Sequence, residues 1–293
     1  MKSALSQLVV IRPRSLAHAL KALHEANGER PVPLAGGTDL FVYLNAGTQR
    51  GRRFLDLWSL RELRGIRMGR THATLGALTT FREIREHAGM RRRFPALVAA
   101  AAEIGAAQIQ NRATIGGNIA NASPAGDSLP VLMAHDALVI ARSVRGERAI
   151  AFEHLFRGYR DLTLEPDELI VAVQIPYAAP RSFAFFRKVG TRRAQSISKV
   201  VFSGLLHTGR GGKVDRVRLA WGSVAPVTRR AAEAERAILG HRPAEAVEAA
   251  RAALERDIAP IDDIRSTRDY RVAVAGNVLE QFLRIADPRY LRV

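Results

Sequence analysis

The chain has 293 residues, of which 47% are hydrophobic and 25% charged, a composition typical of a globular protein of about two domains. It contains no cysteine, which excludes disulfides, thiolate metal sites and any iron–sulfur cluster held by this chain. Its apolar runs are far shorter than the ~18 residues of a membrane span, so we expect no membrane span and a cytoplasmic location.

The formal net charge is +17, which raises the possibility of a nucleic-acid partner. Only five of the 45 basic residues are lysines, and the arginines are spread over the whole chain, with residues 91–93 as the longest run. No basic stretch alternates with aromatic residues as a single-strand-binding surface would. We therefore expect no nucleic-acid partner; the charge is read instead as scattered solvated arginines or as a basic face for an acidic protein partner. The eight histidines show no metal-ligand spacing, so no metal site is predicted.

The first 35 residues predict a βαβ-like unit. Apolar runs predict strands over residues 7–12 and 32–35. Between them, Ser15 is a typical N-cap for an amphipathic helix, and Asn27 with Gly28 would end it. The second strand leads into a glycine pair, at the position where open α/β sheets bind ligands.

The middle of the chain predicts strands interspersed with helices. Expected strands cover residues 53–57, 72–78 (edge-like), 137–141, 148–152 and 168–175. Expected helices cover residues 80–87, opened by a capping box, 94–109, as one alanine-rich buried helix, and 128–134, with Asp127 as a candidate N-cap. A turn or short helix is expected near residues 60–66.

Beyond a linker at residues 177–180, the pattern changes. Strands are expected over residues 183–189, 198–207 and 214–221, followed by helices over 228–239, 243–256 and 266–285. This order predicts a small antiparallel sheet with helices packed on one face.

Two glycine pairs form the candidate ligand site. Gly36 and Gly37 follow one expected strand, and Gly116 and Gly117 follow Thr114 in the stretch TIGGNIANASPAGD. Glycine allows positive φ and close backbone approach, and successive amides in such turns can bind phosphate oxygens. Two such turns could grip one diphosphate, although a Gly-Gly pair alone is also typical of a tight surface turn. Neither pair matches the dinucleotide or Walker fingerprints, so an ordinary Rossmann or P-loop site is not predicted.

Several ordered segments resemble the flavoprotein (medium) subunits of molybdenum hydroxylases, the xanthine dehydrogenase and carbon monoxide dehydrogenase family. These segments are 35–39 (AGGTD), 114–118 (TIGGN), 122–127 (ASPAGD), 167–170 (DELI), 175–176 (IP), 188–193 (KVGTRR) and 263–271 (DIRSTRDYR). The resemblance runs from about residue 8 to 285.

The resemblance implies an α+β fold. Two α/β FAD-binding subdomains of the vanillyl-alcohol-oxidase (PCMH) type would cover about residues 1–55 and 56–177. A C-terminal domain of a small antiparallel sheet packed with helices would cover residues 178–293. FAD would lie between the two subdomains.

By similarity, the cofactor-binding residues would come from both glycine segments and from four later positions. They are Leu34, Ala35, Gly36, Gly37, Thr38, Asp39, Leu40, Thr114, Ile115, Gly116, Gly117, Asn118, Ser123, Asp127, Ile170 and Lys188. A cation at Lys188 near the flavin ring would stabilise the reduced flavin; the alternative is an ordinary strand lysine. No catalytic side chain or metal ligand is predicted.

The implied function is that of a flavoprotein oxidoreductase subunit. In such complexes a large molybdopterin subunit hydroxylates the substrate, a small subunit with [2Fe–2S] clusters carries the electrons, and FAD on a chain like this one passes them to NAD, oxygen or another acceptor. The sequence leaves the substrate and the acceptor open. The alternatives are a free-standing flavin oxidase or reductase and a flavin-free basic binding module.

Overall fold

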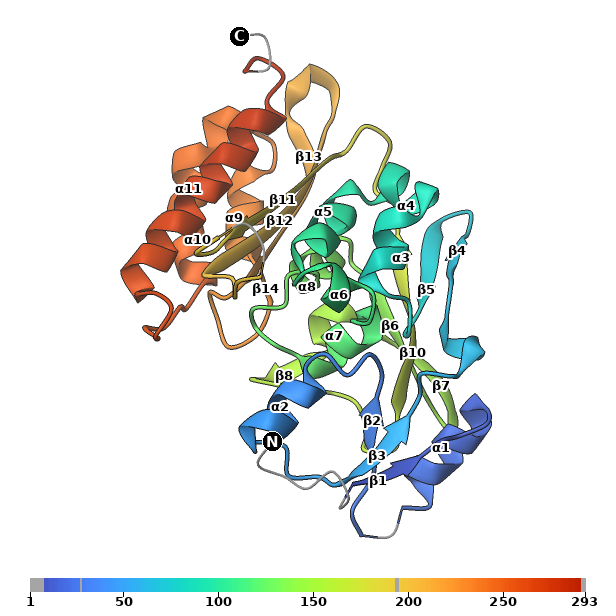
Figure 1. Ribbon diagram of the computed structural model, residues 1–293. Helices are drawn as coiled ribbons and strands as arrows, with labels where there is room; N and C mark the ends of the chain where they lie inside the picture. Colours follow the sequence, from blue (N-terminus) through green and yellow to red (C-terminus); the bar gives the residue numbers. More distant parts are fainter. Residues whose placement is uncertain (1–7, 27, 193–194, 291–293) are drawn as a thin grey trace.

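The computed structural model describes residues 8–26, 28–192 and 195–290, and its mixed helix and sheet architecture confirms the α+β class (Figure 1). Three positions that carried sequence expectations, Gln7, Asn27 and Arg193, lie outside the described residues. None of the described helices is both long and apolar enough to cross a membrane.

The first sheet is small and parallel. Its strand order is β1 (Val9–Ile11), β3 (Arg53–Asp56) and β2 (Val32–Leu34), and helices α1 (Leu16–His24) and α2 (Leu40–Ala46) follow β1 and β2. The βαβ prediction is confirmed, with β3 inserted between the two predicted strands. Ser15 caps α1 as predicted, because its Oγ accepts a hydrogen bond from the amide of His18.

The second sheet is antiparallel and has five strands. Its order is β4 (Ile66–Met68), β5 (His72–Gly76), β10 (Leu169–Pro176), β6 (Leu138–Ser143) and β7 (Gly146–Ala151). The expectation that residues 72–78 form an edge strand is wrong, because β4 pairs with the outer side of β5. The sequence analysis missed β4 because it is only three residues long, has arginine at its centre, and begins at Ile66, which was assigned to a turn or short helix.

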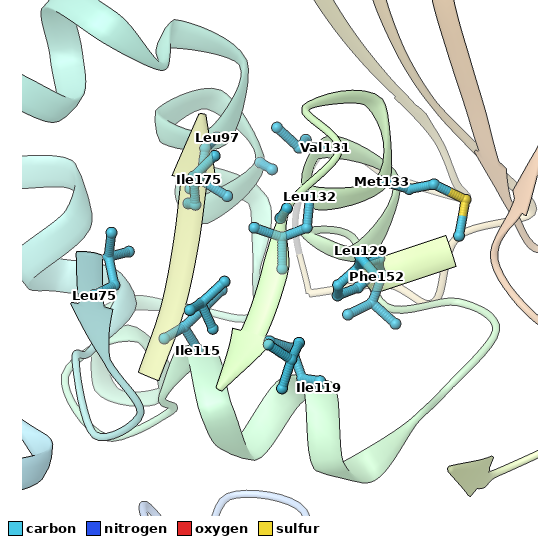
Figure 2. Close-up of a cluster of buried hydrophobic side chains, with 14 of the residues drawn as sticks. Leu75, Leu97, Ile115, Ile119, Leu129, Val131, Leu132, Met133, Phe152 and Ile175 are labelled. Carbon is cyan, nitrogen blue, oxygen red and sulfur yellow. The ribbon is translucent and has the colours of Figure 1, made fainter. Parts of the chain in front are cut away.

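Short helices cover one face of this sheet. They are α3 (Phe81–Glu86), α4 (Ala88–Arg93), α5 (Pro95–Glu103), α6 (Ala107–Gln110), α7 (Ile115–Asn121) and α8 (Leu129–Ala134), and a 3-10 turn spans Arg61–Leu63. Figure 2 shows how Ile115 and Ile119 of α7 reach into the same buried cluster as Leu75, Leu132 and Ile175. This packing fixes α7 on the sheet.

The single helix predicted over residues 94–109 is in fact two helices, α5 and α6. The break lies at Gly105, whose φ of +55° belongs to the left-handed region that ends helices. The side chain of Gln110 donates hydrogen bonds to the carbonyls of Ala102 and Ile104, which the break leaves without helical partners. Alanine content predicted the helix, but one glycine decides where it ends.

The C-terminal region is a four-stranded antiparallel sheet with helices on one face (Figure 1). The strand order is β11 (Phe183–Val189), β12 (Val200–Thr208), β13 (Val214–Gly222) and β14 (Arg229–Arg230); the helices are α9 (Ala232–Ile238), α10 (Val247–Asp257) and α11 (Arg268–Ala286). The three predicted strands and three predicted helices are confirmed. The two-residue strand β14 was predicted as the start of a helix, because two residues carry no periodicity of their own.

Shorter elements complete the chain. They are the 3-10 turns Phe152–His154, Arg210–Gly212 and Pro243–Ala246, and the hairpin of β8 (Phe156–Gly158) and β9 (Asp161–Leu162). The C-terminal sheet packs against α5 and α8, so the C-terminal region contacts the five-stranded subdomain directly.

Candidate functional site

The first glycine segment is a turn of open backbone amides between β2 and α2. Gly37 has φ +78°, the positive value that the sequence predicted. Gly36 needs the absence of a side chain, since an added Cβ would lie 1.8 Å from the carbonyl oxygen of Arg112. Within the described residues, the amides of Gly36, Gly37, Thr38, Asp39 and Leu40 have no hydrogen-bond acceptor. Five consecutive free donors are suited to an anion.

The second glycine segment differs from its prediction. Gly116 and Gly117 do not have positive φ; they lie in the first turn of α7, with Thr114 as its N-cap. The amide of Gly116 donates to the carbonyl of Ala77, and that of Gly117 donates to Oγ1 of Thr114. The amide of Ile115 is likewise bonded within the protein. These amides are therefore already satisfied.

Glycine at these two positions serves close packing. A Cβ on Gly116 would lie 2.7 Å from both the Cβ and the carbonyl oxygen of Ala77. A Cβ on Gly117 would lie 2.9 Å from Oγ1 of Thr114 and 3.8 Å from the Cβ of Ala35. Because Ala35 precedes the first glycine pair, the structure brings the two glycine segments side by side, as the sequence predicted.

Asp127 and Lys188 form a buried ion pair. Lys188 Nζ lies 2.6 Å from Asp127 Oδ2, and their side chains are only 3% and 9% exposed. Ser198 donates to the other carboxylate oxygen of Asp127 at 2.5 Å, and Lys188 also donates to the carbonyl of Glu103. Burial raises the pKa of Asp127, and the charge of Lys188 opposes that rise. The positive charge of Lys188 is thus balanced within the protein.

The sequence suggested Asp127 as the N-cap of α8, but this prediction is wrong. The residue at that position is Ser128, and its side chain makes no capping bond. The carboxylate of Asp127 turns instead toward β11 and the segment before β12, where Lys188 and Ser198 bind it. Asp127 and Lys188 are 61 residues apart in the sequence, so a local capping pattern could not predict their contact.

The remaining predicted residues lie on the elements around the glycine segments. Asn118 of α7 accepts a hydrogen bond from the hydroxyl of Ser128 at 2.7 Å. The Ser123 hydroxyl accepts one from the amide of Ala125. Ile170, in the central strand β10, is 8% exposed and belongs to the same hydrophobic cluster as Ile115.

A polar cluster beside the first glycine turn was not predicted. The Tyr43 hydroxyl donates to Asn121 Oδ1 at 2.9 Å, and Asn121 Nδ2 donates to Asp39 Oδ2 at 3.1 Å. Arg160 donates to both the Tyr43 hydroxyl and Asn121 Oδ1, at 2.6 and 3.1 Å. Burial raises the pKa of Asp39, while the charge of Arg160 lowers it. These residues come from three distant parts of the sequence, so no local sequence motif could predict the cluster.

An arginine stack lies at the end of β3, next to the same turn. The guanidinium carbons of Arg112 and Arg64 lie 3.7 and 4.3 Å from the ring centre of Trp58. Arg112 has no carboxylate partner within the described part of the chain. The backbone carbonyl of Arg112 lies against Gly36, so this arginine lies close to the first glycine turn while its guanidinium stacks on Trp58.

The donors of this site fit the diphosphate of a dinucleotide cofactor. Five open amides and two closely packed glycine segments lie at the same junction. Among the described residues, no group of three or more histidine and carboxylate side chains could hold a metal ion.

Two family models match the chain. One, the FAD binding domain in molybdopterin dehydrogenase, matches residues 4–178, and the other, the CO dehydrogenase flavoprotein C-terminal domain, matches residues 185–286. The nicotinate dehydrogenase FAD-subunit of Eubacterium barkeri is 35% identical over 191 residues, 64% of each chain. The xanthine dehydrogenase FAD-binding subunit of Escherichia coli O157:H7 is 33% identical over 266 residues, 89% of each chain.

Solved structures agree. A chain of the carbon monoxide dehydrogenase from Hydrogenophaga pseudoflava superposes with a TM-score of 0.91 at 28% identity, covering 96% of this chain and 97% of that one. The first family model alone covers more than half of the chain, and the glycine segments lie within it. This chain therefore belongs to the family of FAD-binding (medium) subunits of molybdenum hydroxylases, the flavoproteins of the xanthine and carbon monoxide dehydrogenase type.

Proposed function

We propose that this chain is the FAD-binding electron-transfer subunit of a heteromeric molybdenum hydroxylase. It would take electrons from [2Fe–2S] clusters on a small partner chain, with molybdopterin on a large partner chain, and pass them to NAD, oxygen or another acceptor. The observation that carries this proposal is the turn of five open amides, packed against a second glycine segment, in a chain of this family.

The first glycine segment is the proposed diphosphate site. The amides from Gly36 to Leu40 would donate to the phosphate oxygens, and Leu34 and Ala35 would border them. The second segment, from Thr114 to Asn118, would form the opposite wall, with Gly116 packed closely on Ala77 and Gly117 on Thr114. In this arrangement the amides of the first segment would bind the phosphate oxygens, and the close packing of the second segment would fix the position of the opposite wall.

The flavin end of the site would be lined by Ser123, Asp127, Ile170 and Lys188. Bound FAD supplies the redox chemistry, because it can exchange both single electrons and electron pairs. The chain's own part is to bind, orient and shield. Because Asp127 balances the charge of Lys188, the pair would act on the flavin through fixed hydrogen bonds rather than as a free cation.

The domain boundary that we propose at residue 177 fits this role. We place the FAD-binding domain at residues 1–177, with subdomains of about 1–55 and 56–177, and the C-terminal domain at 178–293. Lys188 and Ser198 would then come from the C-terminal domain and hold Asp127 of the FAD-binding domain. Both domains would thus shape one cofactor site.

The first experiment is the visible absorption spectrum of the purified chain, before and after incubation with FAD and desalting. We expect flavin bands that survive desalting and FAD, rather than FMN, after denaturation. Co-expression with the iron–sulfur and molybdopterin chains should yield a complex in which reducing substrate bleaches the flavin. Reduction of the isolated flavoprotein by its own small substrate would favour a free-standing oxidase. DNA binding without flavin would favour the basic binding module.

A further inference from the structure

Arg160 is held in an unfavourable backbone conformation beside the first glycine turn. It lies at the tip of the hairpin between β8 and β9, and its φ of +54° is in the left-handed region. That conformation costs a non-glycine residue about 1–2 kcal/mol. The surrounding contacts must therefore fix the residue in place.

Those contacts join helices from the two subdomains. Arg160 donates to Tyr43 of α2 and to Asn121, the last residue of α7, and its guanidinium carbon lies 5.2 Å from the ring centre of Tyr43. Tyr43 also donates to Asn121, which in turn donates to Asp39 at the start of α2. Figure 1 shows α2, β8 and α7 next to one another in the lower part of the molecule.

The position of this cluster relates directly to the open amides. The turn of residues 36–40 leads into α2, whereas α7 begins with the second glycine segment, so a link between α2 and α7 sets the separation of the two walls. The hydrogen bonds of Arg160 within the described chain go to neutral oxygens, and its charge lowers the pKa of Asp39 without a direct ion pair between the two described side chains. Part of that charge remains for a second anion nearby.

We propose that Arg160 is a positioning residue of the cofactor site: it holds α2 against α7 and supplies positive charge for the diphosphate of FAD. This inference rests on the proposed FAD site and adds a residue from outside both glycine segments. It assigns the β8–β9 hairpin a role in binding the adenosine diphosphate half of the cofactor. The riboflavin half should not depend on it.

The test compares three ligands on flavin-free full-length chain: FAD, ADP and riboflavin. In R160Q we expect affinity for FAD and ADP to fall by about ten-fold or more, the loss typical of a hydrogen bond to a charged group. Riboflavin affinity should be unchanged. Added salt should weaken FAD binding less steeply in R160Q than in the wild type, because one charge has been removed. R160K should retain part of the affinity.

The matched control is R157Q in the same hairpin. Arg157 is 58% exposed and pairs with Asp161, so its removal should leave all three affinities unchanged. Equal FAD and ADP affinity in R160Q and R157Q would overturn the proposal, as would a lower melting temperature of R160Q without weaker ADP binding. If R160Q does not fold, Y43F removes only the linking hydroxyl and should weaken ADP binding by about three-fold or more; unchanged binding there would also overturn it. A wild-type chain that binds no FAD would instead refute the proposed function.

Discussion

Individual glycines contribute to this site in different ways. Gly37 is needed for its positive φ, whereas Gly36, Gly116 and Gly117 are needed because neighbouring atoms occupy the space of a Cβ. The sequence shows two identical Gly-Gly pairs and cannot distinguish these reasons. The two reasons can be told apart only in the structure, where the backbone of Arg112 lies against Gly36 and that of Ala77 lies against Gly116.

At this scale we predict that Gly36→Ala abolishes FAD retention. The new Cβ would lie 1.8 Å from the Arg112 carbonyl oxygen, and a backbone group cannot move aside as a flexible side chain can. The two segments must then separate, so we expect flavin content after desalting to fall by at least about ten-fold and stability by about 1–3 kcal/mol. Gly158→Ala is the control, since nothing lies within 4 Å of its Cβ position. Normal flavin content in Gly36→Ala would contradict the proposed site.

Among the elements, α8 depends on a buried neutral histidine. His135 is the C-cap of α8, packs edge-on against Phe94 at 5.2 Å and is 5% exposed. Its Nδ1 lies 3.3 Å from the carbonyl oxygen of Pro176, which can only accept, so Nδ1 carries the proton. Burial lowers the pKa of His135 from 6.5 to about 4.

This arrangement predicts a specific loss of stability in acid. Below pH 6.5 the unfolded chain binds a proton at His135 that the folded chain does not, so stability is full above pH 6.5 and falls toward pH 4. This pKa shift corresponds to a loss of about 3 kcal/mol in the free energy of unfolding between pH 6.5 and pH 4. Urea unfolding at pH 7 and pH 4.5 should show a smaller acid-dependent loss for His135→Gln than for the wild type. Equal losses in both would assign the effect to other groups.

At the scale of the whole molecule, the C-terminal region and the five-stranded subdomain share a buried ion pair. Lys188 and Ser198 come from the C-terminal sheet region, and Asp127 comes from the loop before α8. A second connection joins Arg218 of β13 to Asp136 at 2.9 Å. The buried pair should matter more, because its partners are shielded from water.

We therefore predict that Lys188→Met destabilises the chain by about 3–5 kcal/mol, since it leaves the Asp127 carboxylate buried without its counter-charge. The double variant Lys188→Met with Asp127→Leu should recover most of that loss. Lys21→Met, which breaks an exposed pair with Glu25, should cost less than about 1 kcal/mol. Urea unfolding of the four chains measures this; a double variant less stable than Lys188→Met would show that the pair is not the cause.

Much of the fold could be predicted from local pattern. The capping box from Thr80 to Glu83, the N-cap Ser15 and the long strands β10, β12 and β13 all formed where periodicity and capping chemistry indicated. The short strands β4 and β14 could not, because their sequences, IRM and RR, lack the apolar run that predicted the similarly short β1 and β2. Gly105 interrupts a predicted helix because glycine adopts a left-handed backbone conformation at little cost in free energy.

The sequence by itself determined the family, the cofactor class and the two glycine segments, because ordered motifs and the absence of cysteine are local properties of the chain. Only the tertiary structure decided which glycine segment has free amides, that Asp127 binds Lys188 instead of capping α8, and that Arg160 reaches both Tyr43 and Asn121. The physical reason is distance along the chain. Hydrogen bonds and burial join residues that sequence patterns cannot relate, and these contacts set the charge and shape of the site.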